Sequence, residues 1–256
     1  MSQLEEVTRF YVKESAREQA FTNIWEKEIN AVFADVANYY DRVNRVANLG
    51  LISWFRRSFI STIDVKPDYK VLDVCAGTNA VGIALLQKEP GLEVNAVDRS
   101  ADMQRVGQEN AKARGLHIES TITDVHKLPY PDNHFDVVTL QFASRHLRLI
   151  EVIKEVRRVL KPGGHFYHSD MLRPGNKLVE KAYFAYLTGC VSFVAWMFKS
   201  NKYALGCKKY FVDALRLFYS PEEMTQLLYD QGFTNVSSKS LLGGVVCSHK
   251  SAKAAS

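Results

Sequence analysis

A strand, a loop of small residues and the start of a helix follow one another in residues 70–82, and this segment constrains the fold more than any other. It reads Lys-Val-Leu-Asp-Val-Cys-Ala-Gly-Thr-Asn-Ala-Val-Gly. Such a segment lets backbone N–H groups and a helix N-terminus approach a charged ligand closely. A second predicted strand, 92–98, ends in Asp98. This acid lies about 20 residues past the loop, where nucleotide-binding α/β folds place a ribose-binding carboxylate. The two segments together indicate a nucleoside cofactor.

The order of the later segments predicts a doubly wound α/β fold. The loop lacks the full dinucleotide fingerprint Gly-x-Gly-x-x-Gly, since only Gly77 and Gly82 are present, so the loop alone is weak evidence. Parallel strands that alternate with helices are expected near 70–75, 92–97, 117–122, 135–141 and 165–170. A terminal hairpin of 234–239 and 244–247 completes a mostly parallel seven-stranded sheet with helices on both faces. The cofactor is expected at the carboxyl ends of the first strands.

Length and patterning predict one catalytic domain with an added N-terminal cover. A chain of 256 residues can bury one sizeable core. We expect an N-terminal helical extension and lid over 1–60, the cofactor-binding domain over 61–250, and a frayed tail over 251–256. Apolar residues recur at helical spacing within the first 46 residues. This part is predicted to pack over the mouth of the cofactor site, and a dimer contact or a membrane-surface helix are the alternatives.

Composition excludes several classes of partner and location. Hydrophobic residues make up 46% of the chain and charged residues 24%, as in globular proteins. The formal charge is +5, and the absence of a basic run interleaved with aromatic residues argues against nucleic acid. The cysteines at 75, 190, 207 and 247 lack the spacing of a metal site or a disulfide framework. Because the N-terminus carries acids instead of a basic signal, a cytoplasmic protein is expected.

A long apolar run near the C-terminal third raises the question of a membrane. Residues 182–198 form a run of 17 residues flanked by lysines, which is at the lower limit for a bilayer span. Polar residues inside the run and its place between sheet strands argue against a span. It is interpreted as a helix that roofs a substrate pocket, with flanking lysines near anionic headgroups of a membrane surface. An ordinary helix buried on the core is the alternative.

Five motifs relate the chain to a known family. They occupy residues 34–44, 71–78, 128–136, 158–164 and 243–249, and include Tyr-Tyr-Asp-Arg-Val-Asn, Val-Leu-Asp-Val-Cys-Ala-Gly-Thr and Arg-Val-Leu-Lys-Pro-Gly-Gly. With these motifs the chain resembles the ubiquinone/menaquinone C-methyltransferase family over about 34–249. The resemblance implies a Rossmann-like class I methyltransferase fold and S-adenosylmethionine (SAM) as cofactor. It also implies methylation of an aromatic ring carbon of a prenylated benzoquinol or naphthoquinol.

The resemblance and the local pattern together assign the cofactor site. A carboxylate at the end of a strand can accept hydrogen bonds from both ribose hydroxyls, and this favours Asp98 for the ribose. A helix-capping role is the alternative for such an acid. The resemblance places the methionine portion near the first strand and loop, and adenine beside the third strand. The predicted cofactor-binding residues are Asp73, Gly77, Thr78, Asn79, Asp98, Arg99, Met103, Asp124, Val125 and Gln141.

The loop departs from the family pattern at two positions. Where the family has Gly-Thr-Gly-Asp, this chain has Gly-Thr-Asn-Ala, with Asn79 for a glycine and Ala80 for an acid. Asparagine tolerates positive φ better than most residues, so the turn is expected to survive. The missing acid is expected to change how the methionine amino group is held.

Methylation of an aromatic carbon requires an electron-rich ring whose hydroxyl loses its proton. A cation or hydrogen-bond donor must then stabilise the oxyanion. The resemblance places the family arginine at Arg145, as the group that stabilises the phenolate. His146, which replaces a family asparagine, has a pKa suited to a general base, although a solvent-facing histidine is equally compatible with the sequence. Tyr40 and Asp41 match a family Tyr-Asp pair and are expected to hold the ring from the lid side.

Three further polar residues occupy the late strands. Asp170 falls on the family acid after the fifth strand. His249 either closes the pocket or has a structural role, and His168 is expected to belong to the sheet.

Three functions remain compatible with the sequence. The first is a SAM-dependent C-methyltransferase of quinol precursors in menaquinone or ubiquinone biosynthesis. The second is a SAM-using enzyme that acts on another aromatic or quinone, because the Asn79-Ala80 loop is altered. The third is a SAM-binding accessory subunit without turnover. Expected partners are a lipophilic aromatic substrate, a peripheral membrane contact and a second copy of the chain.

Overall fold

The computed structural model describes residues 3–40, 50–197 and 202–255. Its strands are β1 (Lys70–Val74), β2 (Glu93–Asp98), β3 (Glu119–Ile122), β4 (Phe135–Gln141), β5 (Leu160–Met171), β6 (Phe233–Leu241) and β7 (Val246–Lys253). The helices of the N-terminal half are α1 (Gln3–Asn23), α2 (Ile29–Val36), α4 (Leu51–Ile60), α5 (Ala80–Lys88) and α6 (Ala101–Lys112). The later helices are α7 (Leu149–Val159), α8 (Lys177–Met197), α9 (Lys202–Arg216) and α10 (Pro221–Asp230). A short 3₁₀ helix, η3 (Ser144–His146), follows β4.

The strands form one seven-stranded sheet in the order β3-β2-β1-β4-β5-β7-β6. Strands β1 to β5 run parallel to one another, and β7 runs antiparallel to both β5 and β6. The predicted α/β fold with a closing hairpin is therefore confirmed. The strand order reverses beside β1, between β1 and β4, and this is where open α/β sheets bind ligands.

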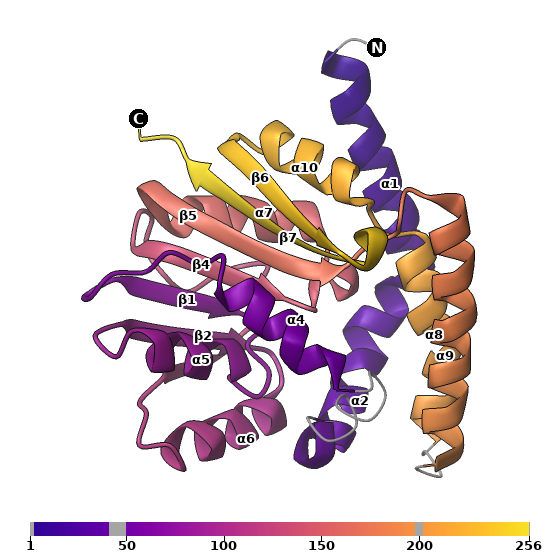
Figure 1. Ribbon diagram of the computed structural model, residues 1–256, viewed down its shortest axis with the longest axis horizontal. Helices are drawn as coiled ribbons and strands as arrows, with labels where there is room; N and C mark the ends of the chain where they lie inside the picture. Colours follow the sequence, from indigo (N-terminus) through magenta and orange to yellow (C-terminus); the bar gives the residue numbers. More distant parts are fainter. Residues whose placement is uncertain (1–2, 41–49, 198–201, 256) are drawn as a thin grey trace.

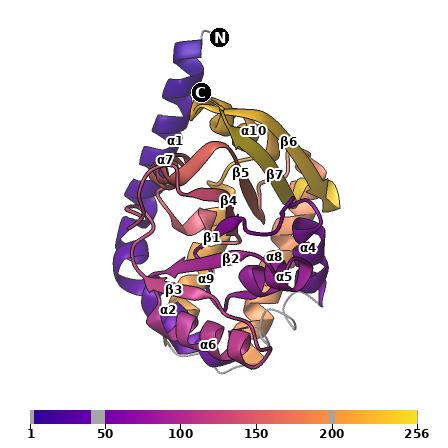
Figure 2. The ribbon, with the colours of Figure 1, turned by 90° about the vertical axis from the view of Figure 1, so that its left-hand side faces the viewer.

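Helices cover both faces of the sheet (Figures 1 and 2). In β1, Leu72 and Val74 belong to a cluster that includes residues of α7 and α10, whereas Val71 belongs to a cluster that includes residues of α4 and α5. Successive residues of a strand point to opposite faces, so a strand covered by helices on both sides needs a continuous apolar run. Each of these β1 side chains is completely buried.

The predicted helical character of the N-terminal segment and of the apolar run near the C-terminal third is confirmed. The N-terminal segment forms α1 and α2, joined by a π-helical turn at Ile24–Glu28, and residues 182–197 of the apolar run lie in α8. Figure 1 shows α8 and α9 side by side at one end of the sheet. Among the residues that the structure describes, no helix combines the length and apolar character that crossing a bilayer requires.

The C-terminus corrects one expectation about the domain limits. Residues 251–253 continue β7, where Phe166 pairs with Ser251 and His165 with Ala252, instead of fraying. Ser251 is completely buried, and Lys253 Nζ donates to Leu160 O at 2.8 Å. The sequence pattern missed this because Ser-Ala-Lys lacks the β-branched residues typical of strands. The boundary between extension and domain near residue 60 stays a prediction.

Truncation tests the corrected C-terminus. A chain that ends at Lys253 should unfold at the same temperature as the full chain, because only residues after the strand are lost. A chain that ends at Lys250 should unfold about 4 °C lower or more, because it loses ladder hydrogen bonds and buried surface. Thermal unfolding followed by circular dichroism measures both. Equal unfolding temperatures for the two truncated chains would contradict the extension of β7.

Candidate functional site

The register between β1 and β2 brings two acids to the same edge of the sheet. Val74 pairs with Val97, so Asp73 lies near the end of β1 and Asp98 ends β2. The loop after β1 then wraps around Asp98. Gly77 N donates to Asp98 Oδ2 at 2.9 Å, and Ser100 N donates to Oδ1 at 2.8 Å. Backbone N–H groups thus fix the Asp98 carboxylate at the edge of the sheet where the parallel strands end.

A cavity at this edge brings together most of the predicted site. The predicted residues among its lining are Tyr40, Asp73, Gly77, Thr78, Asp98, Arg99, Met103, Gln141 and His146. They come from the N-terminal cover, the loops after β1 and β2, the first turn of α6, the end of β4 and η3. Aromatic side chains of Phe33 and Phe142 add apolar walls. The cavity therefore joins carboxylates to a flat aromatic surface.

Burial sets the charge of Asp73. Thr139 Oγ1 donates to Asp73 Oδ1 at 2.7 Å, and Oδ2 is buried without a hydrogen-bond partner among the described residues. Burial raises the pKa of Asp73 to about 7, although the Thr139 hydroxyl and, more weakly, the Gly82 N–H oppose the rise. Burial also raises the pKa of Asp98, against the N–H groups that bind it. An orphaned carboxylate oxygen that lines a cavity is suited to bind a cationic donor.

Asn79 shapes the loop without facing the cavity. Its φ is 58°, so the expectation that asparagine preserves the left-handed turn is confirmed. Its side chain is completely buried, and Oδ1 accepts from Gln104 Nε2 at 3.0 Å. A Cβ at Gly107 would lie 2.8 Å from Asn79 Cγ, so the amide occupies a notch in α6. The Asn79 side chain therefore has a structural role, because the turn directs it into this notch, and the assignment of Asn79 to the cofactor site stays a prediction.

The residues predicted beside adenine lie outside the cavity lining. The Asp124 side chain is exposed and accepts from His126 N at 3.0 Å, which forms a local turn after β3. Val125 is buried in the apolar cluster that packs against α7. Thr123 N donates to Asp98 O at 3.0 Å, so this loop still borders the end of β2. The structure does not bring Asp124 and Val125 into contact with the cavity, because the turn directs one outward and the other into the core.

Arg145 is ion-paired at the side of the cavity. Its Nη1 donates to Asp170 Oδ1 at 2.7 Å and to Phe142 O at 3.1 Å. Asp170 is completely buried. Burial is the largest single influence and lowers the pKa of Arg145, but Asp170 and three nearby tyrosines together outweigh it, so the pKa is raised overall. The predicted arginine and Asp170 are therefore partners, although Asp170 lies at the end of β5 and not after it, and Arg145 lies beside the lining residues rather than among them.

His146 is a buried, neutral histidine that lines the cavity. Its Nδ1 is hydrogen-bonded to the Tyr210 hydroxyl, to which Trp25 Nε1 donates at 2.9 Å. Its Nε2 is buried without a hydrogen-bond partner among the described residues. Burial lowers the pKa of His146 well below 6.5, and the nearby Arg145 and Arg17 lower it further. The alternative of a solvent-facing histidine is thus wrong.

The other predicted residues separate into two groups. Tyr40 lines the cavity, with its ring 6.1 Å from that of Phe33, whereas Asp41 lies outside the described residues. His168 is hydrogen-bonded through Nε2 to Ser144 Oγ at 2.7 Å, and His249 Nε2 donates to Pro221 O at 3.1 Å. Burial lowers the pKa of each of these two histidines to about 3. Both have structural roles within the sheet, as expected for His168.

Sequence reasoning missed Tyr210 and Arg56. Tyr210 lies on α9, 64 residues after the histidine that it binds, so no local pattern connects them. Arg56 lines the cavity from α4, and its buried Nε has no hydrogen-bond partner among the described residues. The sequence signal that could have found Arg56 is the Arg-Arg pair after Trp-Phe, because a charged residue among apolar residues of a helix is unusual.

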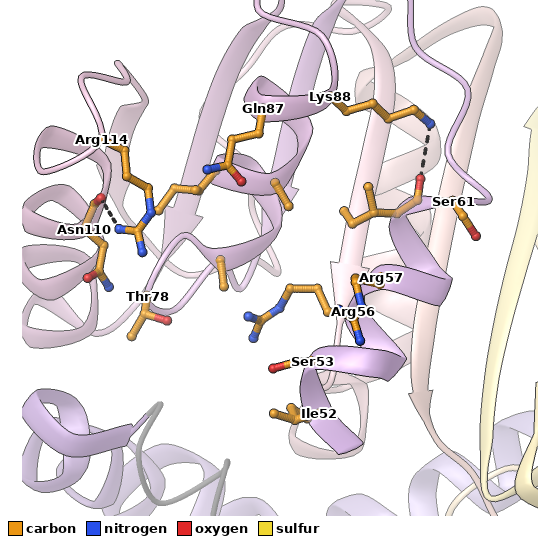
Figure 3. Close-up of a pocket in the computed structure, with 14 residues that line it drawn as sticks. Ile52, Ser53, Arg56, Arg57, Ser61, Thr78, Gln87, Lys88, Asn110 and Arg114 are labelled. Atoms are coloured by element: carbon orange, nitrogen blue, oxygen red, sulfur yellow. Dashed lines mark hydrogen bonds between the residues drawn. The ribbon is translucent and has the colours of Figure 1, made fainter. Parts of the chain in front are cut away.

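A second, larger cavity of about 560 Å³ adjoins the first between α4, α5 and α6 (Figure 3). The two cavities share Arg56, Thr78 and Ala80. Figure 3 shows Arg56 entering it from α4 and Arg114 from the turn after α6, while Lys88 Nζ donates to Ile60 O at 3.2 Å. No carboxylate occurs among its described lining residues. This cavity is therefore suited to anionic groups.

Known proteins resemble this chain along most of its length. A model of the ubiE/COQ5 methyltransferase family matches residues 21–253. A protein of Pseudomonas putida strain W619, named ubiquinone/menaquinone biosynthesis C-methyltransferase UbiE, is 31% identical over 89% of both chains. A protein of the same name from Burkholderia multivorans is 32% identical over 89% of this chain and 93% of its own.

Solved structures confirm the fold. A putative O-methyltransferase from Nostoc punctiforme aligns with a TM-score of 0.65 at 17% identity, over 97% of this chain and 69% of its own. A SAM-dependent methyltransferase of Thermotoga maritima, described as a possible histamine N-methyltransferase, aligns with a TM-score of 0.61 at 18% identity, over 87% of this chain and 98% of its own.

The raised pKa of Asp73 predicts a pH-dependent stability. The unfolded chain releases this proton near pH 3.8, whereas the folded chain keeps it until about pH 7. The Asp73 contribution to the free energy of unfolding therefore decreases as pH rises through this window, and the penalty is complete above it. D73N removes the penalty. Urea unfolding should show that the free energy of unfolding of D73N exceeds that of the wild type by more at about pH 8 than at about pH 5. The same stability difference at both pH values would contradict the assignment.

Proposed function

The chain belongs to the ubiE/COQ5 methyltransferase family and is a SAM-dependent methyltransferase, and we propose that it methylates a ring carbon of a prenylated benzoquinol or naphthoquinol. Relatives that cover 89% of the chain are named for ubiquinone and menaquinone biosynthesis. The observation that carries the proposal is one cavity that combines Asp73 and Asp98 with a neutral histidine and aromatic walls.

The residues of the cavity fit the cofactor. Asp98 retains lone pairs on both oxygens and would accept the ribose hydroxyls. The orphaned Oδ2 of Asp73 would accept from the methionine ammonium, which favours the ionised acid. Arg56, also at this edge, would attract the methionine carboxylate. When bound, the cofactor would supply an electrophilic methyl group, and these residues would hold it beside the aromatic walls of the cavity.

The proposed role of His146 is to remove the proton of the acceptor hydroxyl. Because the pKa of His146 is lowered, the ring is neutral at physiological pH, which is the form that can accept a proton; the same shift makes it a weaker base, so the oxyanion that forms beside it would have to stabilise the imidazolium. In the tautomer in which Nδ1 donates its hydrogen to the Tyr210 oxygen, Nε2 carries no hydrogen and can accept the proton. Loss of the hydroxyl proton makes the acceptor's aromatic carbon electron-rich. Removal of the proton therefore assists formation of the bond between this carbon and the methyl group. Arg145 contributes a positive field from the side of the cavity, where Asp170 fixes its orientation.

A peripheral membrane contact is part of the proposal, since prenylated quinols reside in bilayers. Leu51 and Trp54 on α4 are 37% and 40% exposed, and Leu178 and Tyr186 on α8 are 79% and 45% exposed. The cationic cavity beside α4 would attract anionic headgroups (Figure 3). The contact of two copies of the chain stays a prediction.

A methyl-transfer assay tests the proposed reaction. The wild type should transfer the labelled methyl group of SAM to a short-tailed demethylmenaquinol. H146N, which places the family residue at this position, should lower kcat about 100-fold because the base is lost, while the SAM affinity measured by calorimetry stays unchanged. A wild-type kcat in H146N would contradict the role of the histidine.

Calorimetry with D98A tests the assignment of the ribose-binding acid. D98A should weaken SAM binding at least about tenfold, because charge-assisted hydrogen bonds to the ribose are lost. D102A, which removes an exposed acid on the first turn of α6, is the matched control.

SAM binding by the wild type without turnover of any quinol would favour an accessory subunit. Turnover of another aromatic alone would favour a different substrate.

Liposome sedimentation tests the membrane contact. The wild type should bind anionic vesicles at low salt, and binding should decrease as salt increases. The double variant W54A/R57A should bind about tenfold more weakly, because it loses an exposed aromatic anchor and a cation. R105A, which removes an exposed arginine paired with Glu109 on α6, should bind like the wild type. No binding of the wild type at low salt would contradict the proposal.

A further inference from the structure

The N-terminal helix α1 carries a charged pair into the protein interior. Arg17 is completely buried and Glu14 is 4% exposed. Arg17 Nη1 donates to Glu14 Oε2 at 2.5 Å, and the Arg17 guanidinium lies 4.8 Å from the ring centroid of Phe218. Buried charges are costly unless the remaining donors and acceptors are also satisfied. The partners that satisfy this pair therefore show what the pair holds in place.

Those partners are the backbone groups of the segment that carries His146. Arg17 Nη2 donates to Arg145 O at 3.1 Å and to Leu147 O at 3.3 Å, with Ser144 O at 3.5 Å. The carbonyls that Arg17 binds therefore come from His146's two chain neighbours and from the start of η3. The fork of the guanidinium suits such grouped acceptors better than the point charge of a lysine would.

Glu14 fixes the other end of the same segment. Its Oε1 accepts from the N–H of Leu149, the first residue of α7, and its Oε2 accepts from Tyr219 Oη at 2.8 Å. The first N–H groups of a helix have no partner within the helix, so this carboxylate satisfies one of them. The pair thus holds the chain from η3 to the start of α7. Figure 2 shows α1 alongside α7.

A second contact of the N-terminal segment holds the ring of His146. Trp25, just beyond α1, donates to the Tyr210 hydroxyl, which is hydrogen-bonded to His146 Nδ1. The segment therefore determines both the backbone and the ring orientation of one histidine. The family match begins at residue 21, so Glu14 and Arg17 lie outside the part of the chain whose role the family explains.

We infer that α1 is a strap for the active-site loop, in which Glu14 and Arg17 are positioning residues that direct His146 toward the acceptor. The inference rests on the proposed role of His146 for its effect on rate. Its structural half, the ordering of residues 144–149 by α1, is independent of the substrate.

The test compares a neutralised pair with a matched control on the full chain. R17M alone would leave Glu14 charged and buried without a partner and risks unfolding, so E14Q/R17M removes both charges together. R17K keeps the charge and loses the fork. R9M removes another α1 arginine, whose Nη2 binds Glu223 Oε1 at 2.8 Å on α10, far along the chain from the loop.

Hydrogen exchange and kinetics give separate readouts. In E14Q/R17M the amides of 144–149 should exchange about tenfold faster or more, and kcat should decrease about tenfold, with SAM affinity unchanged. R17K should show a smaller change in the same direction, and R9M should match the wild type in both. In the H146N background the pair substitution should cause no further loss of kcat, because positioning residues act through the histidine that is no longer present.

The outcomes distinguish failure of the strap from failure of the proposed function. Unchanged exchange of 144–149 in both E14Q/R17M and R17K would overturn the strap, as would a loss of kcat that is fully additive with H146N. If E14Q/R17M does not fold, R17K decides by the same measurements. If the wild type methylates no quinol, the proposed function fails, and the exchange data still decide whether α1 orders the loop.

Discussion

The parallel register of β1 against β2 is the constraint on which the site depends. Because Val74 lies opposite Val97, the loop that leaves β1 passes directly over the carboxylate that ends β2. Two N–H groups then fix Asp98, and Asp73 remains behind the loop with one oxygen unsatisfied. A one-residue slip would exchange the faces of the strand and separate the acids from the loop. Sheet packing and ligand binding therefore impose the same register.

Burial beneath the N-terminal cover sets the charges of the site. The same desolvation raises the pKa of Asp73 and lowers that of His146, so both groups favour the neutral form without a ligand. A cationic ligand group would favour ionised Asp73, whereas His146 is already in the form that accepts a proton. The charged groups of the interior occur in pairs, Arg145 with Asp170 and Arg17 with Glu14. Burial thus favours the neutral forms of Asp73 and His146, while the buried Arg145 and Arg17 each have a carboxylate partner.

Local sequence signals predicted the parts of the site that depend on one strand or one turn. Asp73 and Asp98 could be assigned because each lies at or near the end of an apolar strand, and the φ of Asn79 followed from its residue type. The direction of the Asn79 side chain could not be predicted, because it depends on the absence of a Cβ at Gly107, 28 positions later. The orientation of the Asp124 side chain was not readable either, since it depends on a local turn with His126, and the assignment of Asp124 to adenine stays a prediction.

Long-range partners account for the remaining differences. Glu14 and Arg17 have the i, i+3 spacing of an ordinary surface pair, and only the packing of α1 against Phe218 and Tyr219 shows that they are buried. The link from Tyr210 to His146 likewise joins α9 to η3. Fold and cofactor edge are therefore readable from periodicity, whereas the orientation of the catalytic loop is a property of the assembled tertiary structure.

A crystal structure of the protein with S-adenosylhomocysteine tests the central claim most directly. The account predicts ribose hydroxyls within hydrogen-bond distance of the Asp98 carboxylate, the amino group of the ligand at Asp73 Oδ2, and the His146 ring bordering the space beside the sulfur. A ligand bound elsewhere on the sheet, or an ordered ligand that touches neither acid, would contradict it.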